Sequence, residues 1–361
     1  MKYQVNPFIR IKFQDPLICE LLLDGKELKL PDYRYVQLIS ALKDPLEANE
    51  VLDKIEAIFH QPQATQTIFQ EICKNKIFVT EEEYKTYNLE GLRHWQKRNW
   101  LDALLLHLKS NDLNYKDDSY ETVNDSKENK HLIFSKLIET EGIPELWKKY
   151  PDFSSIALPN PEELHDRDIE EVMLSRRSGK LWKNTTLSLQ LLSNILFHAN
   201  KEGNESRKEV ENSISKKSGL EKMLISAFSS LETYFFAFKV EGLDPGIYHY
   251  DMQKHAVVKI KEGMFNNELV KMCIGQRMPR SCSCAFILTS VWERYMFRYR
   301  HTRAYRNLLI NVSELAHKYI LLATGYTLSN WITPAIEEAY AESLLNIDGQ
   351  KESPLYTIAI G

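Results

Sequence analysis

A short stretch near the middle of the chain carries the residue types that hold phosphate groups. It reads Arg176-Arg177-Ser178-Gly179-Lys180-Leu181-Trp182 and follows a predicted helix. Arginine offers a planar fork of donors, serine a hydroxyl, and glycine a backbone N–H that a ligand can approach closely. The alternative is a solvated basic helix end, because cations also suit a helix C-terminus. Spacing alone leaves both interpretations open.

A second stretch combines a turn with aromatic residues. Residues 242–251 read Gly-Leu-Asp-Pro-Gly-Ile-Tyr-His-Tyr-Asp, and His255 follows. The glycines and proline predict a hairpin turn that leads into an aromatic strand. No catalytic role is needed to explain this pattern. We expect His249 and His255 to be surface or turn residues rather than metal ligands.

A third stretch, Trp292–Arg306, interleaves five arginines with aromatic residues. Such a surface can stack the bases of single-stranded nucleic acid and contact its phosphates. The same residues can line an anionic cofactor pocket with a tyrosine as the acid, or form a plain charged helix face. Nearby, Cys282 and Cys284 lack the spacing and the second pair of a zinc site. We therefore predict no metal.

Composition limits the class of protein. The 361-residue chain is 43% hydrophobic and 27% charged, which is enough for sizeable cores. A net charge of -4 argues against general attraction to nucleic acid. The five cysteines are scattered and odd in number, which favours a reducing cytoplasm. We find no signal-peptide pattern at the N-terminus, and the apolar runs are too short to cross a bilayer.

The elements that would position these residues fall into two predicted domains. Residues 1–110 predict a small winged-helix-like module followed by a helical stretch over 90–110. Its expected strands are Phe8–Phe13, Ile18–Leu23 and Lys76–Thr80, with a hairpin turn at Asp24-Gly25, and its expected helices are Tyr33–Leu42, Ala48–Phe59 and Thr65–Ile72. Residues 111–159 are polar and then proline-rich, which predicts a linker and an irregular segment.

Residues 160–361 predict an α+β domain, with helices packed on a mainly antiparallel sheet. Its first helix is expected to start at Asn160-Pro161-Glu162-Glu163 and to bury Ile169, Val172 and Met173. The polar stretch 201–220 predicts a loop. The other expected helices are 187–199 and 306–324, and the expected strands are 234–240, 247–250, 256–260, 285–291 and 355–360.

The order of these motifs resembles one protein family. An Arg-Arg-Ser-x-Lys turn, a Gly-Leu-x-Pro-Gly-x-Tyr-x-Tyr hairpin, an Arg-x-Tyr-Arg helix and a final Pro-Leu-Tyr-x-x-x-x-Gly occur here in that order. Residues 160–361 thereby resemble the azoline dehydrogenases of streptolysin, cyanobactin and microcin pathways, a branch of the nitroreductase superfamily. The stretch from His94 to Ala103 resembles a helix that follows a winged-helix-like module in longer members. In such enzymes related modules can bind the leader of a precursor peptide.

This resemblance implies a nitroreductase-like fold with FMN at a homodimer interface, where both subunits build the pocket. It implies dehydrogenation of thiazoline or oxazoline rings, or of a related bond, in a ribosomally made precursor peptide, within a cyclodehydratase complex. The implied cofactor residues are Arg176, Arg177, Ser178, Lys180, Ser226 and Gln276. The family's catalytic Lys-Tyr pair falls on Arg298-Tyr299, so Tyr299 would be the general acid or base beside the flavin.

The chain also departs from the family pattern at flavin-site positions. Arg298 stands for the lysine, and an arginine stays protonated. Met223–Ser230 contains no glycine where the family has a Pro-Ser-Gly-Gly-like turn, and Ser226 is the nearest substitute for its serine. Ser313–Lys318 and Thr333-Pro334 also replace family motifs. These changes favour an alternative function as a degenerate scaffold or partner subunit that binds a peptide without redox catalysis. Nucleic-acid binding through 294–306 ranks last.

Overall fold

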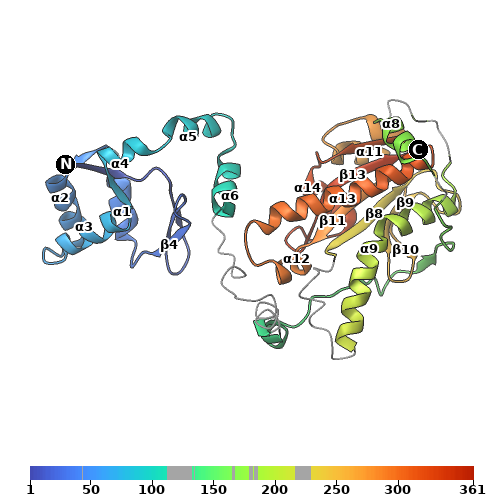
Figure 1. Ribbon diagram of the computed structural model, residues 1–361, viewed down its shortest axis with the longest axis horizontal. Coiled ribbons are helices and arrows are strands. Elements are labelled where there is room, and N and C mark those ends of the chain that lie inside the picture. The colour runs from blue at the N-terminus through green and yellow to red at the C-terminus, as the bar shows by residue number, and fades with distance from the viewer. Residues whose placement is uncertain are drawn as a thin grey trace. The chain divides into compact units, whose positions relative to one another are not determined.

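The computed structural model describes residues 1–42, 44–111, 132–133, 135–164, 167–178, 182, 186–215 and 229–361. The chain divides into two compact units, Met1–Tyr115 and Lys116–Gly361 (Figure 1).

The N-terminal unit builds two small antiparallel sheets and a helical core. One sheet has the order β5-β1-β6 and the other β2-β3-β4. The predicted strands and helices are confirmed, and Gly25 has the positive φ of 64° that its hairpin turn requires. The elements are β1 (Lys2–Val5), β2 (Ile9–Lys12), β3 (Ile18–Leu21), β4 (Lys26–Lys29), α1 (Arg34–Ala41), β5 (Leu46–Glu47), α2 (Ala48–Phe59), α3 (Thr65–Lys74) and β6 (Phe78–Thr80).

Three further helices follow in this unit: α4 (Glu81–Thr86), α5 (Leu89–Gln96) and α6 (Leu101–Asn111). The stretch predicted as helical over 90–110 is thus interrupted between Gln96 and Leu101. A buried carboxylate, Glu20 on β3, forms ion pairs with Arg10, Lys12 and Lys109 of α6. Burial disfavours the charged form of Glu20, but these three cations outweigh it and lower its pKa to about 2.

The C-terminal unit is built on a seven-stranded sheet with the order β12-β13-β11-β8-β9-β10-β7. All neighbouring strands in it run antiparallel. The strands are β7 (Ser155–Ala157), β8 (Leu231–Ala237), β9 (Gly246–Asp251), β10 (Ala256–Glu262), β11 (Cys284–Val291), β12 (Asn330–Thr333) and β13 (Glu352–Ile360). The predicted α+β class with a mainly antiparallel sheet is confirmed.

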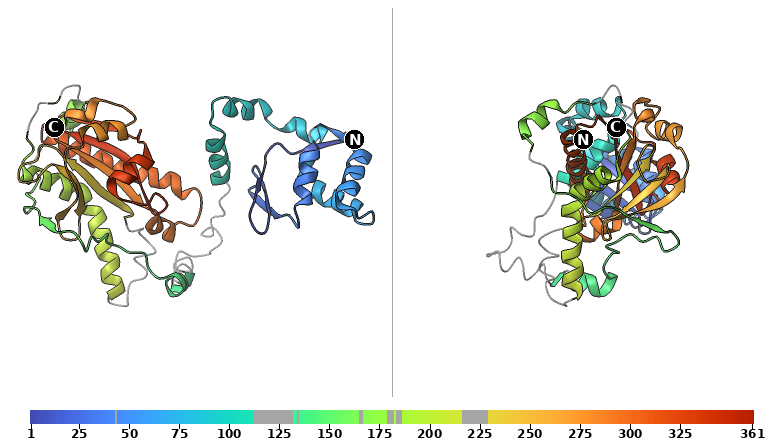
Figure 2. Two further views of the ribbon diagram at one scale, coloured as in Figure 1. Left: turned by 180° about the vertical axis from the view of Figure 1, so that it is seen from behind. Right: turned by 90° about the vertical axis from the view of Figure 1, so that its right-hand side faces the viewer.

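Helices cover both faces of this sheet (Figure 1, Figure 2). The two long helices α9 (Leu189–Ser215) and α13 (Ala304–Gly325) pack on the face that carries Phe235, Phe286 and Ile358. The shorter helices α11 (Asn266–Met272) and α14 (Glu338–Leu345) pack on the opposite face. The unit therefore has three layers, and its long strands are buried on both sides.

The strand register defines two ends of the sheet. Asn330 pairs with Ile360, which pairs with Cys284 at the start of β11, and we name this the Asn330 end. Val291 closes β11 at the other end, where helix α12 (Trp292–Arg298) follows at once, and we name this the α12 end. At roughly 3.3 Å per strand residue, β11 separates the two ends by about 23 Å.

The helix predicted to start at Asn160 starts later. Helix α8 spans Ile169–Ser175, and its N-cap is Asp168, whose side chain accepts bonds from two backbone N–H groups. The chain before it is fixed instead by α9, because Asn194 Oδ1 accepts from the Glu162 backbone N–H at 2.9 Å. The expected buried side of this helix is wrong as well, since Ile169 is 67% and Met173 60% exposed.

The loop predicted over 201–220 is also wrong where the structure describes it. Helix α9 continues to Ser215. This part of the helix is polar in composition, yet one of its faces is buried. Asn204, Arg207 and Val210 follow at three-residue spacing on that face. The polar composition had predicted a solvated loop. Instead, Asn204 and Arg207 are buried and donate hydrogen bonds to backbone carbonyls outside the helix.

Candidate functional site

The proposed phosphate-binding turn lies beside the edge strand β12. Helix α8 ends at Arg176, whose backbone N–H donates to the Val172 carbonyl. Ser178 then forms a parallel bridge with Asn330. The indole N–H of Trp182 donates to the Met278 carbonyl at 2.6 Å. Lys180 lies outside the described residues.

A pocket of about 320 Å³ opens at the Asn330 end. Two arginines, Arg167 and Arg177, bring positive charge to it. Asn330 is 2% exposed, and its Oδ1 has no hydrogen-bond partner among the described residues. Its Nδ2 donates to Thr324 Oγ1 at 3.1 Å. The remaining lining residues are Glu171, Val172, Ser175, Thr324, Gly325, Thr327, Leu328 and Ser329.

Gln276 reaches the same strand from the other side. Its Nε2 donates to Thr333 Oγ1 at 3.1 Å. Thr333 lies three residues beyond Asn330 on β12, a separation of about 10 Å. Ser178 and Gln276, two of the predicted cofactor residues, thus contact one short strand, but at Asn330 and Thr333, whose side chains point to opposite faces of the sheet. Arg177 lines the pocket, whereas Ser178 and Gln276 do not. Ser226 lies outside the described residues.

These residues fit the phosphate and ribityl parts of FMN. Arginine and serine donors suit a phosphate, and charge-assisted hydrogen bonds of this kind are strong. The buried Asn330 Oδ1 is an acceptor that a ligand hydroxyl can satisfy, which relieves the cost of an unsatisfied buried group. The donor set and the orphaned acceptor together match a polyhydroxylated phosphate ester.

The predicted catalytic pair lies at the α12 end. Arg298 is the last residue of α12 and Tyr299 is its C-cap. The half-buried Tyr299 ring packs 4.9 Å from the Tyr295 ring and 6.2 Å from the His301 ring, measured between centroids. The Arg298 guanidinium lies 5.8 Å from the Tyr299 ring centroid. Helix α12 ends at Arg298 and the next helix, α13, starts at Ala304, so the arginine-rich stretch is not one continuous helix.

The structure does not bring the two predicted groups together within one chain. Thr324, near the C-terminus of α13, lines the pocket at the Asn330 end, whereas Asn311 of the same helix bonds Tyr295 at the α12 end. Thirteen helical residues separate them, about 20 Å. Figure 1 shows α8 near the C-terminus and α12 at the opposite end of the sheet.

A buried charged network at the α12 end was missed in the sequence. Glu232 Oε1 binds Arg207 at 3.0 Å and also binds Arg294, and its Oε2 lies 2.9 Å from His249 Nε2. All four side chains are at most 2% exposed. Burial disfavours the charged form of Glu232, but the two guanidinium groups and His249 hold its pKa well below its usual range. The sequence feature that could have indicated this network is Glu232, a glutamate within the apolar run 231–237.

The two histidines behave differently. The expectation of a surface or turn position for His249 is wrong, because its ring is buried in that network. His255 lies in the β9–β10 turn with a positive φ of 49°, as predicted. Its Nδ1 lies 2.9 Å from the Tyr250 hydroxyl and its Nε2 2.8 Å from Ser193 Oγ. Burial lowers the pKa of His255, so the neutral ring is favoured.

No group of three or more His, Cys, Asp or Glu side chains among the described residues is arranged to hold a metal ion. None of the helices in the described ranges is long and apolar enough to cross a membrane.

Comparison with known proteins gives one relative that matches nearly the whole chain and two that match parts of it. The trifolitoxin operon protein TfxC of Rhizobium leguminosarum bv. trifolii is 27% identical over 369 residues, covering 99% of both chains. The nitroreductase candidate MJ1384 of Methanocaldococcus jannaschii is 27% identical over 212 residues, covering 58% of this chain and 97% of its own. The trifolitoxin-processing protein TfxB is 29% identical over 126 residues, 34% of each chain. No family model matches.

Solved structures with a similar arrangement have low sequence identity. A nitroreductase-type protein of Anabaena variabilis aligns with a TM-score of 0.49 at 22% identity, covering 61% of this chain and 44% of its own. A chain of the E. coli microcin synthetase McbBCD complex aligns with a TM-score of 0.41 at 16% identity, covering 70% of this chain and 98% of its own. The likeness to nitroreductases therefore rests on the sequence relatives and not on these solved structures.

Proposed function

From the premise that Lys116–Gly361 is a nitroreductase-like domain, we propose that the protein is an FMN-dependent oxidoreductase. Its proposed substrate is an azoline ring, or a related bond, in a ribosomally made peptide. The substrate class is supported by the relative TfxC, whose name places it in the trifolitoxin operon and which matches the whole chain. The observation that carries the cofactor assignment is the pocket at the Asn330 end, where Arg177 and the buried Asn330 Oδ1 lie together and Ser178 is bridged to Asn330.

In this proposal the residues at the Asn330 end hold the cofactor. Arg176, Arg177 and Ser178 bind the phosphate, Asn330 Oδ1 accepts from a ribityl hydroxyl, and Gln276 lies further along β12. FMN, when bound, supplies the two-electron redox chemistry, and the protein supplies position and electrostatics. Tyr299 exchanges a proton with the substrate, and the adjacent Arg298 guanidinium lies 5.8 Å from the centre of its ring.

The separation of the two ends supports a site shared by two subunits. In a two-fold dimer the same patches meet reciprocally, so the Asn330 end of one protomer can face the α12 end of its partner. Each of the two sites then takes its cofactor-binding residues from one chain and its tyrosine from the other. The exposed apolar side chains of α8, Met173 and Leu174 among them, offer surface for such a contact.

The N-terminal unit is proposed to recognise the precursor peptide. The match to TfxC extends through this unit, so its role belongs to the same process. We propose that this winged-helix-like unit binds the leader segment of the precursor peptide. We also expect a cyclodehydratase to act on the same peptide before this protein does.

Purified full-length protein tests the cofactor assignment. It should be yellow, with flavin absorbance near about 450 nm, a property of the cofactor itself. Arg177→Ala should weaken FMN binding by about tenfold or more, because hydrogen bonds to charged groups contribute roughly 1.5–3 kcal/mol. Lys254→Ala, which removes an exposed cation from a turn of the same unit, should leave affinity unchanged. A colourless protein that FMN cannot reconstitute would reject the proposal.

A scaffold function is the second candidate. It is favoured by Arg298, which replaces a lysine, and by Thr333-Pro334, where the Thr333 hydroxyl already accepts a bond from Gln276. A scaffold predicts that Tyr299→Phe leaves formation of the pathway product unchanged, while removal of the N-terminal unit abolishes it. Tight stoichiometric FMN and turnover by the isolated protein would rule this function out.

A further inference from the structure

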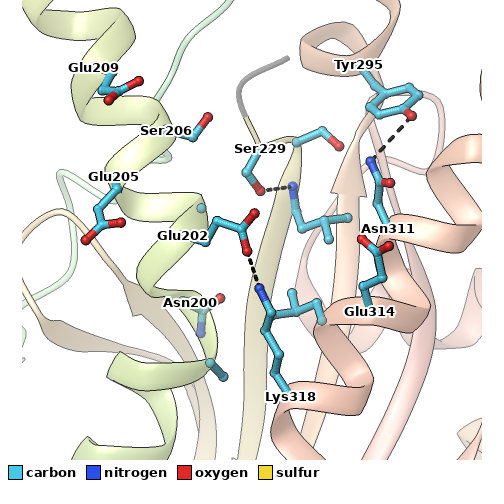
Figure 3. A pocket seen from close by; sticks show the side chains of 15 residues that line it. Asn200, Glu202, Glu205, Ser206, Glu209, Ser229, Tyr295, Asn311, Glu314 and Lys318 are labelled. Atoms are coloured by element: carbon cyan, nitrogen blue, oxygen red, sulfur yellow. Dashed lines mark hydrogen bonds and ion pairs between the residues drawn. The ribbon is translucent and has the colours of Figure 1, made fainter. Parts of the chain in front are cut away.

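The groove between α9 and α13 at the α12 end is lined by carboxylates (Figure 3). Its volume is about 460 Å³, within the roughly 300–1,000 Å³ of small-ligand sites. Helix α9 contributes Glu202, Glu205, Ser206 and Glu209, whose spacing places them on one helix face. This is the helical segment that sequence composition had predicted as a loop.

The opposite wall of the groove carries one cation and one further carboxylate. Helix α13 contributes Asn311, Glu314 and Lys318. Lys318 is bonded across the groove to Glu202 (Figure 3). The other three carboxylates, Glu205, Glu209 and Glu314, form no ion pair with any described residue. Among the described residues, these three carboxylates therefore have no cation paired with them.

The inner wall of the groove connects these charges to the proposed catalytic residue. Ser206 Oγ is buried and has no hydrogen-bond partner among the described residues. Tyr295 lines the groove and its hydroxyl accepts from Asn311 Nδ2 at 3.4 Å. The Tyr295 ring packs against Tyr299. A ligand in the groove thus lies one aromatic ring away from Tyr299.

We propose that this groove binds a positively charged side chain of the peptide substrate. A lysine or arginine close to the processed residue would place its cation among Glu205, Glu209 and Glu314, with Ser206 Oγ as a further acceptor. Opposite charges in a partly enclosed site attract more strongly than in open solvent. This inference rests on the proposed function for the peptide identity of the ligand, whereas the charge preference rests on the groove alone.

Binding of labelled peptides to the full-length protein tests the charge preference. The probes are fluorescein-labelled Gly-Lys-Gly-Lys-Gly and matched peptides with Gln or Glu in place of Lys, followed by fluorescence anisotropy at about 0.05 M salt. We expect the Lys probe to bind at least tenfold more tightly than the Gln probe, and the Glu probe weakest. Salt at about 0.5 M should reduce the difference, because it screens exposed charges. Equal binding of the three probes overturns the proposal.

Matched variants locate the binding. The triple variant Glu205→Gln, Glu209→Gln, Glu314→Gln should weaken the Lys probe by about tenfold, as expected for three partly exposed ion pairs. The control variant Glu241→Gln, Glu262→Gln, Glu338→Gln changes the net charge equally outside the groove and should bind as the native protein does. Unchanged binding by the first variant, with an unchanged melting temperature, contradicts the proposal.

Two further measurements separate the possible failures. Spermidine is a free polycation, and if it binds the groove more tightly than the Lys probe, the ligand is a polyamine and the peptide assignment is wrong. FMN affinity of the groove variant is measured in parallel and should equal the native value. Loss of probe binding with FMN retained supports the groove assignment, whereas native protein that binds the probe but never FMN rejects only the redox function.

Discussion

The two ends of the seven-stranded sheet differ in charge, although one helix, α13, lines both. At the Asn330 end, Arg167 and Arg177 surround hydroxyls and a buried amide oxygen. At the α12 end, Glu205, Glu209 and Glu314 line a groove beside two tyrosines. The first set suits an anionic cofactor and the second a cationic substrate group. In the proposed function, a single chain carries two complementary half-sites about 20 Å apart along α13.

Mixed dimers give the sharpest test of this division. Tyr299→Phe alone should lower turnover by roughly 10²–10⁴, the usual contribution of a general acid or base. Arg177→Ala alone should also lower turnover, through lost cofactor. If each site takes one end from each subunit, a heterodimer of the two variants contains one intact site, and its turnover should recover to about half that of the native dimer.

Purified heterodimers with two different affinity tags allow the measurement. The double variant Arg177→Ala, Tyr299→Phe paired with native chain is the control and leaves no intact shared site. A single-chain site predicts the opposite pattern: the first heterodimer is inactive and the control keeps half the native activity.

The α12 end also depends on its buried charge network. Glu232→Ala leaves Arg207 and Arg294 buried without their carboxylate, and breaking such a buried pair destabilises by about 3–5 kcal/mol. Glu241→Ala, an exposed position nearby in sequence, should change the free energy of unfolding by less than about 0.5 kcal/mol. Urea denaturation measures both. A cost below about 1 kcal/mol for Glu232→Ala would show that the network contributes little.

Acid should destabilise the folded protein by protonating Glu232, the carboxylate of this network. The folded-state pKa of Glu232 lies well below its unfolded value, so its contribution to stability is fully present above the unfolded pKa of about 4.5 and is lost as pH falls below it. Melting temperatures between about pH 7 and 2 should therefore fall on the acid side. The Glu232→Gln variant should show a shallower fall. Parallel curves for the two proteins would place the acid sensitivity elsewhere, with Glu20 in the N-terminal unit as the next residue to test.

The smallest expected effect concerns the Asn330 end. Asn330→Leu removes the orphaned Oδ1 and the bond to Thr324, so FMN should bind about fivefold more weakly, equivalent to about 1 kcal/mol. Probe binding in the acidic groove should not change. Isothermal titration with FMN and the labelled lysine peptide distinguishes the two ends. An equal loss at both would indicate a general structural effect.

Sequence patterns were informative where apolar spacing or motif order was strong. The helices at 34–41, 48–59 and 304–325, the strands around the 242–246 turn and the nitroreductase-like character were all predicted from such patterns. Errors arose where polar residues are buried, and also at α8, where the apolar residues Ile169 and Met173 are exposed. The helical extension over 201–215 and the buried His249 look solvated in sequence, because a partner such as Glu232 comes from another strand.

The sequence alone predicted the α+β class, the likeness to nitroreductases and a stretch of residue types that suit a phosphate, because periodicity and local motifs are properties of the chain itself. The tertiary structure alone shows that Ser178 and Gln276 both contact β12, that Tyr299 lies at the other end of the sheet, and that three glutamates of α9 face Glu314 and Lys318 of α13 across one groove. Those relations depend on strand register and on helix packing, which join residues far apart in sequence and leave no local pattern.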